Sequence, residues 1–150
     1  MLRLTRKLMF AIEAVVDIAY NSGVNPVQSK DIAERQGIPR RYLEQVLQQL
    51  VRADVLRGVR GPRGGYRLAR ERRRISLGEI VRIVAGMDGE AGDEDDAGSE
   101  LGRVVLQPLW QEMEGEALLK LDSVSVETLC RTAREAGIDS RSKKSIDFTI

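Results

Sequence analysis

The sequence lacks the side chains on which much enzyme chemistry depends. Its 150 residues include no histidine and a single cysteine, Cys130. One thiol cannot form an internal disulfide, and the absence of histidine excludes the usual zinc ligand sets and the Ser/His and Cys/His catalytic pairs. No pair of carboxylates has a spacing that suits acid–base catalysis. We therefore expect no catalytic residue, no metal ligand and no cofactor.

The chain also has no long hydrophobic run and almost no net charge. Glu13 and Asp17 interrupt the apolar stretch near the start, so we expect neither a signal peptide nor a membrane span, and a cytoplasmic protein. The formal net charge of +1 conceals two opposed blocks. Arginine dominates 35–74, whereas 88–100 carries only acidic charges. Such a local basic block indicates a polyanionic partner.

Hydrophobic periodicity predicts three helices before the basic block. Thr5 begins the first helix, Ser29 caps the second, and Gly37 ends it. Pro39 suits the first turn of the third, "PRRYLEQVLQQLVRADV". The short connection between the last two helices has helix-turn-helix spacing. The buried stripe of the third helix is expected to consist of Leu43, Val46, Leu47, Leu50 and Val51.

The pattern then changes to that of a β-hairpin, "VLRGVRGPRGGYRL", with a glycine-rich turn. Ser76 and Glu79 have capping-box spacing at the start of a fourth helix, which an acidic, glycine-rich loop follows. A long helix over about 100–121 contains Pro108, where a kink is expected. A last helix, capped by Ser123 or Ser125, ends the fold at Gly137.

Three helices followed by an arginine-bearing hairpin form a winged helix, which predicts double-stranded DNA as the partner. At the hairpin, Arg60 and Arg63 are expected in the minor groove, and Tyr66 is expected to pack the wing onto the domain with its hydroxyl on a DNA phosphate. The third helix offers side chains that can bind base edges in the major groove, namely Arg40, Arg41, Tyr42, Glu44, Gln45 and Gln48. Phosphate contacts are expected from Arg70, Arg72, Arg73 and Arg74.

Other interpretations of these residues remain open. The arginines can form an ordinary solvated surface, and the winged helix can be a protein-interaction module that no longer reads DNA. A phosphate-binding loop is disfavoured because "GPRGG" lacks both common phosphate-loop patterns and no helix is expected to follow it. An enzyme would have to use Glu44, Asp54 or the acidic loop.

The chain resembles the winged-helix dimeric regulators that include IscR, NsrR and CymR. The resemblance covers "LRLTRKLMFAIEAVVDIA", "DIAERQGIPRRYLEQVLQQLVRADVL", "VRGPRGGYRLAR", "ISLGEIVRIVAG" and "LWQEMEGEALLKLDSVSVETL". It implies homodimers on palindromic operators, with Tyr42 and Glu44 in the recognition helix and Arg60 in the wing as DNA contacts. Dimerisation through the long helix would place part of the interface at Val105, Leu109, Met113 and Leu121, with burial inside one subunit as the alternative for each.

The resemblance thus implies a mainly α fold with four parts. These are a winged helix-turn-helix DNA-binding domain with a two-stranded β wing over 1–86, an acidic flexible loop over 87–99, dimerisation helices over 100–137 and a tail over 138–150. Cluster-binding members carry three cysteines in the loop, whereas "MDGEAGDEDDAGSELGR" has none. Because thiolates hold such clusters, the resemblance points to the cluster-free, CymR-like branch. Cys130 is expected to be a buried thiol, with a redox switch as the alternative.

The end of the chain suggests a protein partner. CymR acts with cysteine synthase, the O-acetylserine sulfhydrylase, and "DFTI" resembles the tails by which serine acetyltransferases enter that enzyme's active site. The tail residues concerned are Asp147, Phe148, Thr149 and Ile150. The resemblance implies a repressor of cysteine and sulfur metabolism that cysteine synthase controls. The alternatives are a frayed tail and a cluster-free regulator of another regulon that senses a redox signal or a small molecule.

Overall fold

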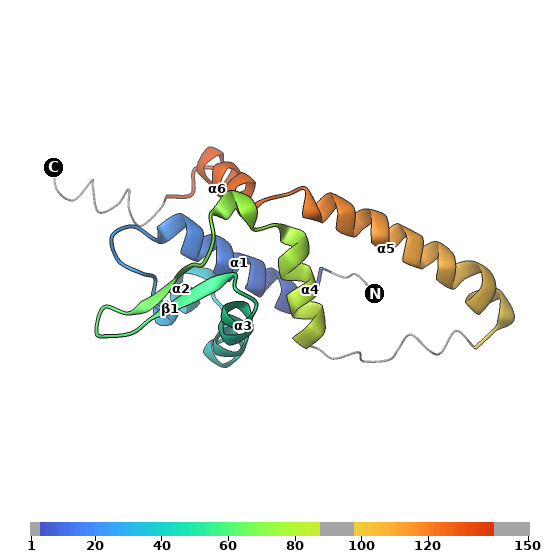
Figure 1. The fold of residues 1–150 in the computed structure, drawn as a ribbon, viewed down its shortest axis with the longest axis horizontal. Helices are drawn as coiled ribbons and strands as arrows, with labels where there is room; N and C mark the ends of the chain where they lie inside the picture. The colour runs from blue at the N-terminus through green and yellow to red at the C-terminus, as the bar shows by residue number, and fades with distance from the viewer. Residues whose placement is uncertain (1–3, 88–97, 140–150) are drawn as a thin grey trace.

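The computed structural model describes residues 4–87 and 98–139. Helix α1 (Arg6–Asn21) is central, and α2 (Ser29–Gln36), α3 (Arg40–Arg52), α4 (Leu77–Met87) and α6 (Val126–Glu135) all contact it (Figure 1). Thr5 caps α1 as predicted, because its hydroxyl accepts a hydrogen bond from the Leu8 amide at 3.1 Å. The largest side chains of the core are apolar and fully buried, among them Ile18, Ile32, Leu43, Leu47, Leu50 and Ile80.

A buried carboxylate joins α1 to α2. The side chain of Asp17 is 0% exposed and accepts two hydrogen bonds from Arg35, at 2.7 and 2.9 Å, and one from Gln36 at 2.8 Å. A buried charge is tolerated only when it is paired in this way. The hydrogen bonding of Arg35 to the Asp17 carboxylate raises the pKa of the Arg35 guanidinium. The last turn of α2, just before the turn to α3, is thereby fixed to the central helix.

The structure differs from the predictions in two helix boundaries and in the burial of one residue. Ser29 does not cap α2: Gln28 precedes the helix, makes no side-chain capping bond, and leaves Ser29 as its first residue. Pro39 lies immediately before α3 rather than in its first turn. Val51 is 37% exposed, because it lies at the edge of the apolar stripe on the last turn of α3. The predicted end of α2 at Gly37 is confirmed, since this glycine is left-handed with φ of 63°.

The wing is an antiparallel hairpin that a third segment extends. Strand β1 (Leu56–Val59) pairs with β2 (Gly65–Leu68), with Val59 opposite Gly65. Val27, in the loop between α1 and α2, exchanges two backbone hydrogen bonds with Tyr66 of β2, at 3.0 and 2.8 Å. This pairing, which was not predicted from the sequence, attaches the wing to the start of the helix-turn-helix.

The long helix is irregular where Pro108 was expected to kink it. The segment Gly102–Leu106 is π-helical and leads directly into α5 (Gln107–Asp122). Proline has no amide hydrogen and its ring crowds the carbonyl four residues earlier, so the wider π turns relieve that conflict. None of the residues of α5 is buried, and Figure 1 shows the helix extending away from the other helices.

Two caps predicted for the later helices are confirmed. Ser76 and Glu79 form the capping box of α4, with the Ser76 hydroxyl 3.2 Å from the Glu79 amide. Of the two candidate caps for α6, Ser125 is the one that binds, accepting from the Thr128 amide at 3.1 Å. Most of the acidic loop and the tail residues Asp147–Ile150 lie outside the described residues. No helix within the described ranges has the length and apolarity needed to cross a membrane.

We predict that Gly65→Ala destabilises the fold. A Cβ atom at Gly65 would lie 2.4 Å from the Val27 carbonyl oxygen, so either the backbone pairing or the wing must move. Such overpacking costs about 1–3 kcal/mol, which urea unfolding followed by circular dichroism would detect. Gly58→Ala, in the opposite strand, is the control, because a Cβ there meets no atom within 4 Å. Equal effects of the two substitutions would contradict the prediction.

Candidate nucleic-acid interface

The first three turns of α3 present a polar face to solvent. Its apolar face is buried in the core, which fixes the helix on the body of the molecule. Arg40 and Glu44 form only a loose ion pair of 4.0 Å, with side chains 64% and 61% exposed, so both groups can turn toward another partner. The predicted base-reading residues that are exposed here are Arg40, Arg41, Glu44, Gln45 and Gln48.

Tyr42 differs from the other residues predicted to read bases. Its hydroxyl donates a hydrogen bond to the Lys7 carbonyl at 2.7 Å, and its half-buried ring lies 5.9 Å from the ring of Phe10. These contacts hold the start of α3 against the start of α1. Tyr42 therefore has a structural role that the sequence analysis missed, and its contact with DNA stays a prediction.

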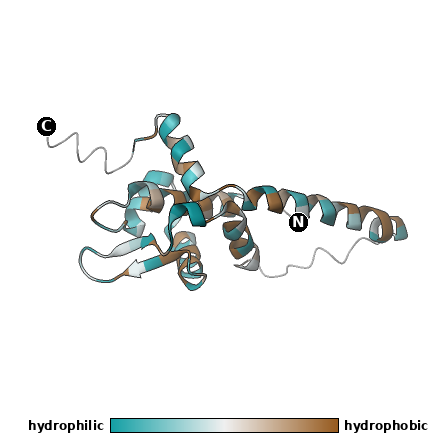
Figure 2. Cartoon of the chain, turned by 45° about the horizontal axis from the view of Figure 1, so that its top comes forward, coloured by the Kyte–Doolittle hydropathy of each residue, from teal (hydrophilic) through white to brown (hydrophobic). Residues whose placement is uncertain are grey.

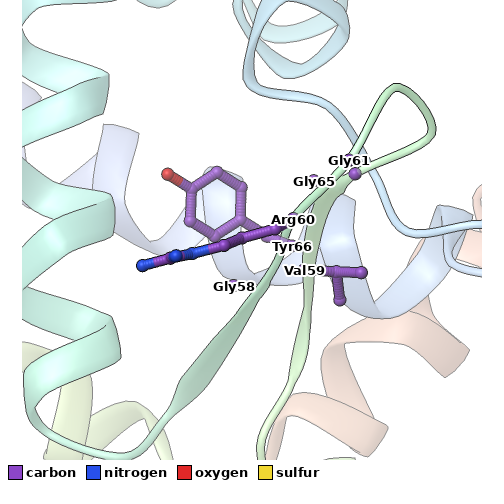
Figure 3. A pocket seen from close by; sticks show the side chains of 7 residues that line it. Gly58, Val59, Arg60, Gly61, Gly65 and Tyr66 are labelled. Carbon is purple, nitrogen blue, oxygen red and sulfur yellow. The ribbon is translucent and has the colours of Figure 1, made fainter.

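The wing offers two exposed arginines beside an open hollow. Arg60 and Arg63 are exposed on the turn, which a 2.9 Å hydrogen bond from the Gly64 amide to the Gly61 carbonyl closes. A hollow of about 500 Å³ is lined mainly by glycines, Arg60 and Tyr66. Figure 3 shows Arg60 and Tyr66 pointing to one side of the hairpin and Val59 to the other. Bare backbone and a guanidinium group together suit close approach to a phosphate backbone or a narrow groove.

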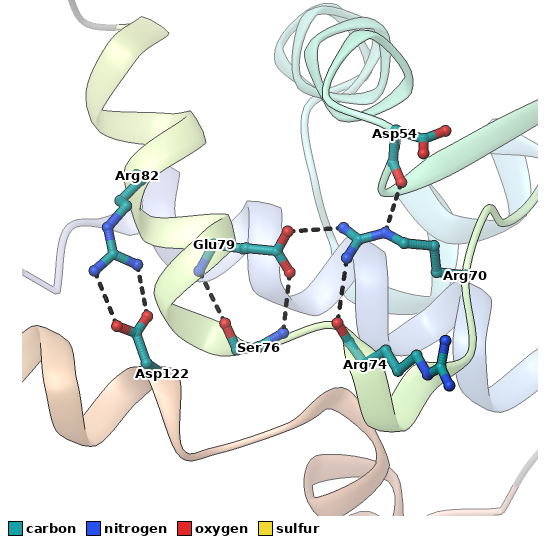
Figure 4. Close-up of polar contacts among 7 residues, drawn as sticks. All are labelled: Asp54, Arg70, Arg74, Ser76, Glu79, Arg82 and Asp122. Atoms are coloured by element: carbon teal, nitrogen blue, oxygen red, sulfur yellow. Dashed lines mark hydrogen bonds and ion pairs between the residues drawn. The ribbon is translucent and has the colours of Figure 1, made fainter.

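Several arginines of the basic block are used inside the chain instead. Arg67 donates to the Gly23 and Val24 carbonyls at 3.2 and 2.6 Å. Arg70 donates to the carbonyls of Asp54 and Arg74 and to the Glu79 carboxylate (Figure 4). These bonds fix the wing and the following turn to the neighbouring helices. Arg67 and Arg70 belong to the basic block that was expected to face a polyanion. They instead hold the wing in place through contacts within the chain.

The arginines of the turn η1 (Arg72–Arg74), which follows the wing, differ in whether they pair within the fold or remain exposed to solvent. Arg72 pairs with Glu127 of α6 at 2.5 Å. Arg73 pairs with Glu71 at 2.6 Å, but both side chains are well exposed, at 68% and 59%. The structure thus engages Arg70 and Arg72 within the fold and leaves Arg73 and Arg74 at the surface for the predicted phosphate contacts.

A second candidate surface lies on the long helix. Figure 2 shows apolar segments along α5, where it stands away from the body. Val105, Leu109 and Met113, predicted to form part of a dimer interface, are each about half exposed. Leu121, the fourth such residue, is half-buried against the core of its own chain, together with Leu118. Further exposed apolar side chains of this region are Leu101, Val104, Leu106, Trp110 and Leu119.

Sequence comparison connects these surfaces to known proteins. The family model Rrf2, described as an iron-dependent transcriptional regulator, matches residues 4–132. The transcriptional regulator IscR of Xenorhabdus nematophila is 33% identical over 141 residues, which cover 93% of this chain and 86% of that protein. IscR of Vibrio cholerae is 46% identical over 83 residues, or 55% of this chain and 48% of that protein.

The sequence lacks the cysteines that an iron–sulfur cluster would need, although the family description mentions iron. Cys130 is the one cysteine of the sequence, lies on α6 with 1% exposure, and has its thiol pKa raised by burial. This agrees with a buried, unreactive thiol. Between residues 4 and 87 and between 98 and 139, no group of three potential metal-binding side chains comes together. An iron–sulfur cluster needs several thiolates, which the sequence does not contain.

Solved structures agree with the fold of the chain. T. potens IscR superposes with a TM-score of 0.72 at 32% identity, over 90% of each chain. CymR of B. subtilis superposes with a TM-score of 0.69 at 27% identity, over 88% of this chain and 98% of that one. The predicted mainly α winged-helix fold is confirmed. The relatives named above are transcriptional regulators. The chain belongs to the Rrf2 family of DNA-binding transcriptional regulators.

Proposed function

We propose that the chain acts as a homodimeric repressor that binds a palindromic operator without a metal cluster and controls genes of cysteine and sulfur metabolism. The observation that carries the DNA-binding part is the polar, exposed face of α3, which lies on the same domain as the exposed wing arginines. An α-helix fits the major groove of B-DNA, and a wing reaches the adjacent minor groove. The two elements would therefore read one half-site together.

Within a half-site, the residues have different tasks. Glu44 accepts a hydrogen bond from cytosine N4, whereas Arg40 and Arg41 bridge guanine O6 and N7, and Gln45 and Gln48 bind adenine. Arg60 and Arg63 occupy the minor groove, where the potential is most negative over narrow A·T-rich segments. Arg73 binds a phosphate, for which it must leave Glu71. The loose Arg40–Glu44 pair costs little to open, which favours this use of both side chains.

The exposed apolar side chains of α5 support homodimerisation. A helix that carries apolar residues around much of its surface is stable in water only when a partner covers it. A second copy of α5 is a partner of matching chemistry, and a two-fold axis between the copies presents two α3 helices to the DNA. Two related half-sites would then be bound at once, which is why the operator is expected to be palindromic.

The assignment to sulfur metabolism rests on two supports. One is the similarity to CymR, described as the global cysteine regulator of B. subtilis. The other is the sequence "DFTI" at Asp147–Ile150, which resembles the tails by which serine acetyltransferases enter the active site of cysteine synthase. O-acetylserine would compete with the tail, since both would occupy that site, and would couple sulfur supply to transcription. The similarity to IscR keeps another regulon as the alternative.

Substitutions should separate base reading from phosphate binding. Glu44→Ala is expected to change the base preference at one operator position by about 1–3 kcal/mol, because it removes an acceptor from the major groove. Arg73→Ala should weaken binding to all sequences alike and lower the salt slope by about 1. Fluorescence anisotropy with a selected operator and its single-base variants, between about 50 and 200 mM salt, measures both effects. Equal, sequence-independent losses would show that Glu44 reads no base.

Dimerisation through α5 should depend on its exposed apolar side chains. Met113→Asp is expected to raise the dimer dissociation constant at least about tenfold, because it buries a charge in the interface. Sedimentation velocity measures the constant, and Trp110, the one tryptophan and 51% exposed in the single chain, should shift its emission to shorter wavelength on association. Gln111→Asp, on the opposite side of the helix, is the control. An unchanged dimer in Met113→Asp would place the interface elsewhere.

The tail should bind cysteine synthase in competition with substrate. A decapeptide of residues 141–150 is expected to bind in calorimetric titration and to be displaced by O-acetylserine. Removal of Ile150 should abolish most of the affinity, because it removes the apolar anchor and moves the carboxylate by about 3.5 Å. Peptides with Lys143→Ala and Lys144→Ala are the controls and should bind almost as well. Absence of binding, or binding indifferent to Ile150, would favour the alternative of another effector.

A further inference from the structure

Besides the apolar packing of Leu118 and Leu121, two sets of polar contacts attach the end of the long helix to the body. At the first, the chain between α5 and α6 pairs with the chain before α4: the Leu77 amide donates to the Val124 carbonyl at 2.9 Å, and the Val126 amide to the Ile75 carbonyl at 2.8 Å. At the second, the Arg82 guanidinium of α4 binds both oxygens of Asp122 at 2.5 and 3.0 Å (Figure 4). One attachment leaves a helix free to swing, whereas a second restricts its direction.

Gly78 makes the second attachment possible. A Cβ atom on Gly78 would lie 1.8 Å from Asp122 Oδ1 and 2.8 Å from its Cγ, so the carboxylate occupies the space that any other residue would fill. The glycine belongs to the first turn of α4, where alanine would otherwise be the better helix former. The bond from Arg82 lowers the pKa of the Asp122 carboxyl below its usual value, so the pair stays charged at neutral pH.

The direction of α5 matters because the helix is long and projects from the body. Its 16 residues span about 24 Å, so a change of about 10° at the Asp122 end moves the other end by about 4 Å. Successive base pairs are about 3.4 Å apart. A small change in this angle therefore shifts the two recognition helices of a dimer by about one base pair relative to each other.

We propose that the Arg82–Asp122 pair over Gly78 sets the spacing between operator half-sites that the dimer accepts. The inference rests on the proposed function, since it requires two chains joined through α5 on one DNA duplex. Arg82 and Asp122 are positioning residues: neither lies on α3 or the wing, and they act through the angle between α5 and the DNA-binding body. Leu118 and Leu121 pack beneath the same end of α5 and keep it attached when the pair is lost.

The test compares single half-sites with spaced pairs. Wild-type protein first selects an operator from random duplexes, and anisotropy then measures binding to one half-site and to full sites whose spacer is changed by one or two base pairs. Wild type should prefer one spacer at least about tenfold over a change of two base pairs. Arg82→Gln, Asp122→Asn and Gly78→Ala should each reduce that preference to about threefold or less, with half-site affinity unchanged within about twofold.

Two further variants test whether loss of folding or loss of one positive charge could explain a reduced spacer preference. The exchange Arg82→Asp with Asp122→Arg should restore much of the spacer preference, which a general loss of folding would not allow. Arg131→Gln, at an exposed arginine of α6, is the control for loss of one positive charge and should behave as wild type. Because the Arg82–Asp122 pair is exposed, its loss should leave the urea midpoint nearly unchanged.

Each outcome decides one claim. An undiminished spacer preference in the three single variants, or parallel losses on half-sites and full sites, would overturn the role of the pair while leaving DNA binding intact. Failure of the wild type to bind any selected duplex, or to prefer a full site over a half-site, would instead overturn the proposed function and this inference with it. Loss of preference in the single variants with recovery in the exchange supports the proposal.

Discussion

The arrangement of the reading elements depends on one buried carboxylate. Asp17 lies in the C-terminal part of the central helix, and its oxygens accept hydrogen bonds from Arg35 and Gln36 at the end of α2. Gly37 and α3 follow directly, so the carboxylate fixes the point from which the recognition helix starts. Apolar packing alone is less directional and would allow α2 to slide. The polar face of α3 is presented to solvent in one orientation because this buried group must remain paired.

The parts of the fold that follow from neighbouring residues were predictable. The Thr5 cap, the left-handed Gly37 and the Ser76–Glu79 capping box are local devices, each settled within four residues of sequence. Pairing between distant segments could not be predicted in this way. The residues around Val27 do not alternate in the manner of a strand, yet Val27 pairs with Tyr66. Such contacts are decided by how the helices bring two loops together, which a single sequence does not show.

The region that forms the candidate site could be predicted from the sequence. The role of each residue within that region could be predicted less well. A guanidinium group can donate to a carbonyl, a carboxylate or a phosphate, so composition cannot tell which arginines face inward. Burial and geometry separate them: Arg67, Arg70 and Arg72 stabilise the wing and its neighbours, whereas Arg60 and Arg63 stay exposed. Tyr42 illustrates the same limit, because its position in the helix suggested a base contact while its hydroxyl binds the Lys7 carbonyl.

The pairing of Val27 with Tyr66 has a consequence for how the protein folds. Helices α2 and α3 and strand β1 all lie between these two residues, so the whole helix-turn-helix is enclosed in a chain loop that the wing closes. Closing a loop costs entropy, and the contacts that offset this cost form only when both ends of the loop are present. During synthesis on the ribosome, the recognition helix therefore gains its final support only after β2 has emerged. A fragment that ends before Gly65 would leave the Val27 amide and carbonyl unpaired, however complete its helices are.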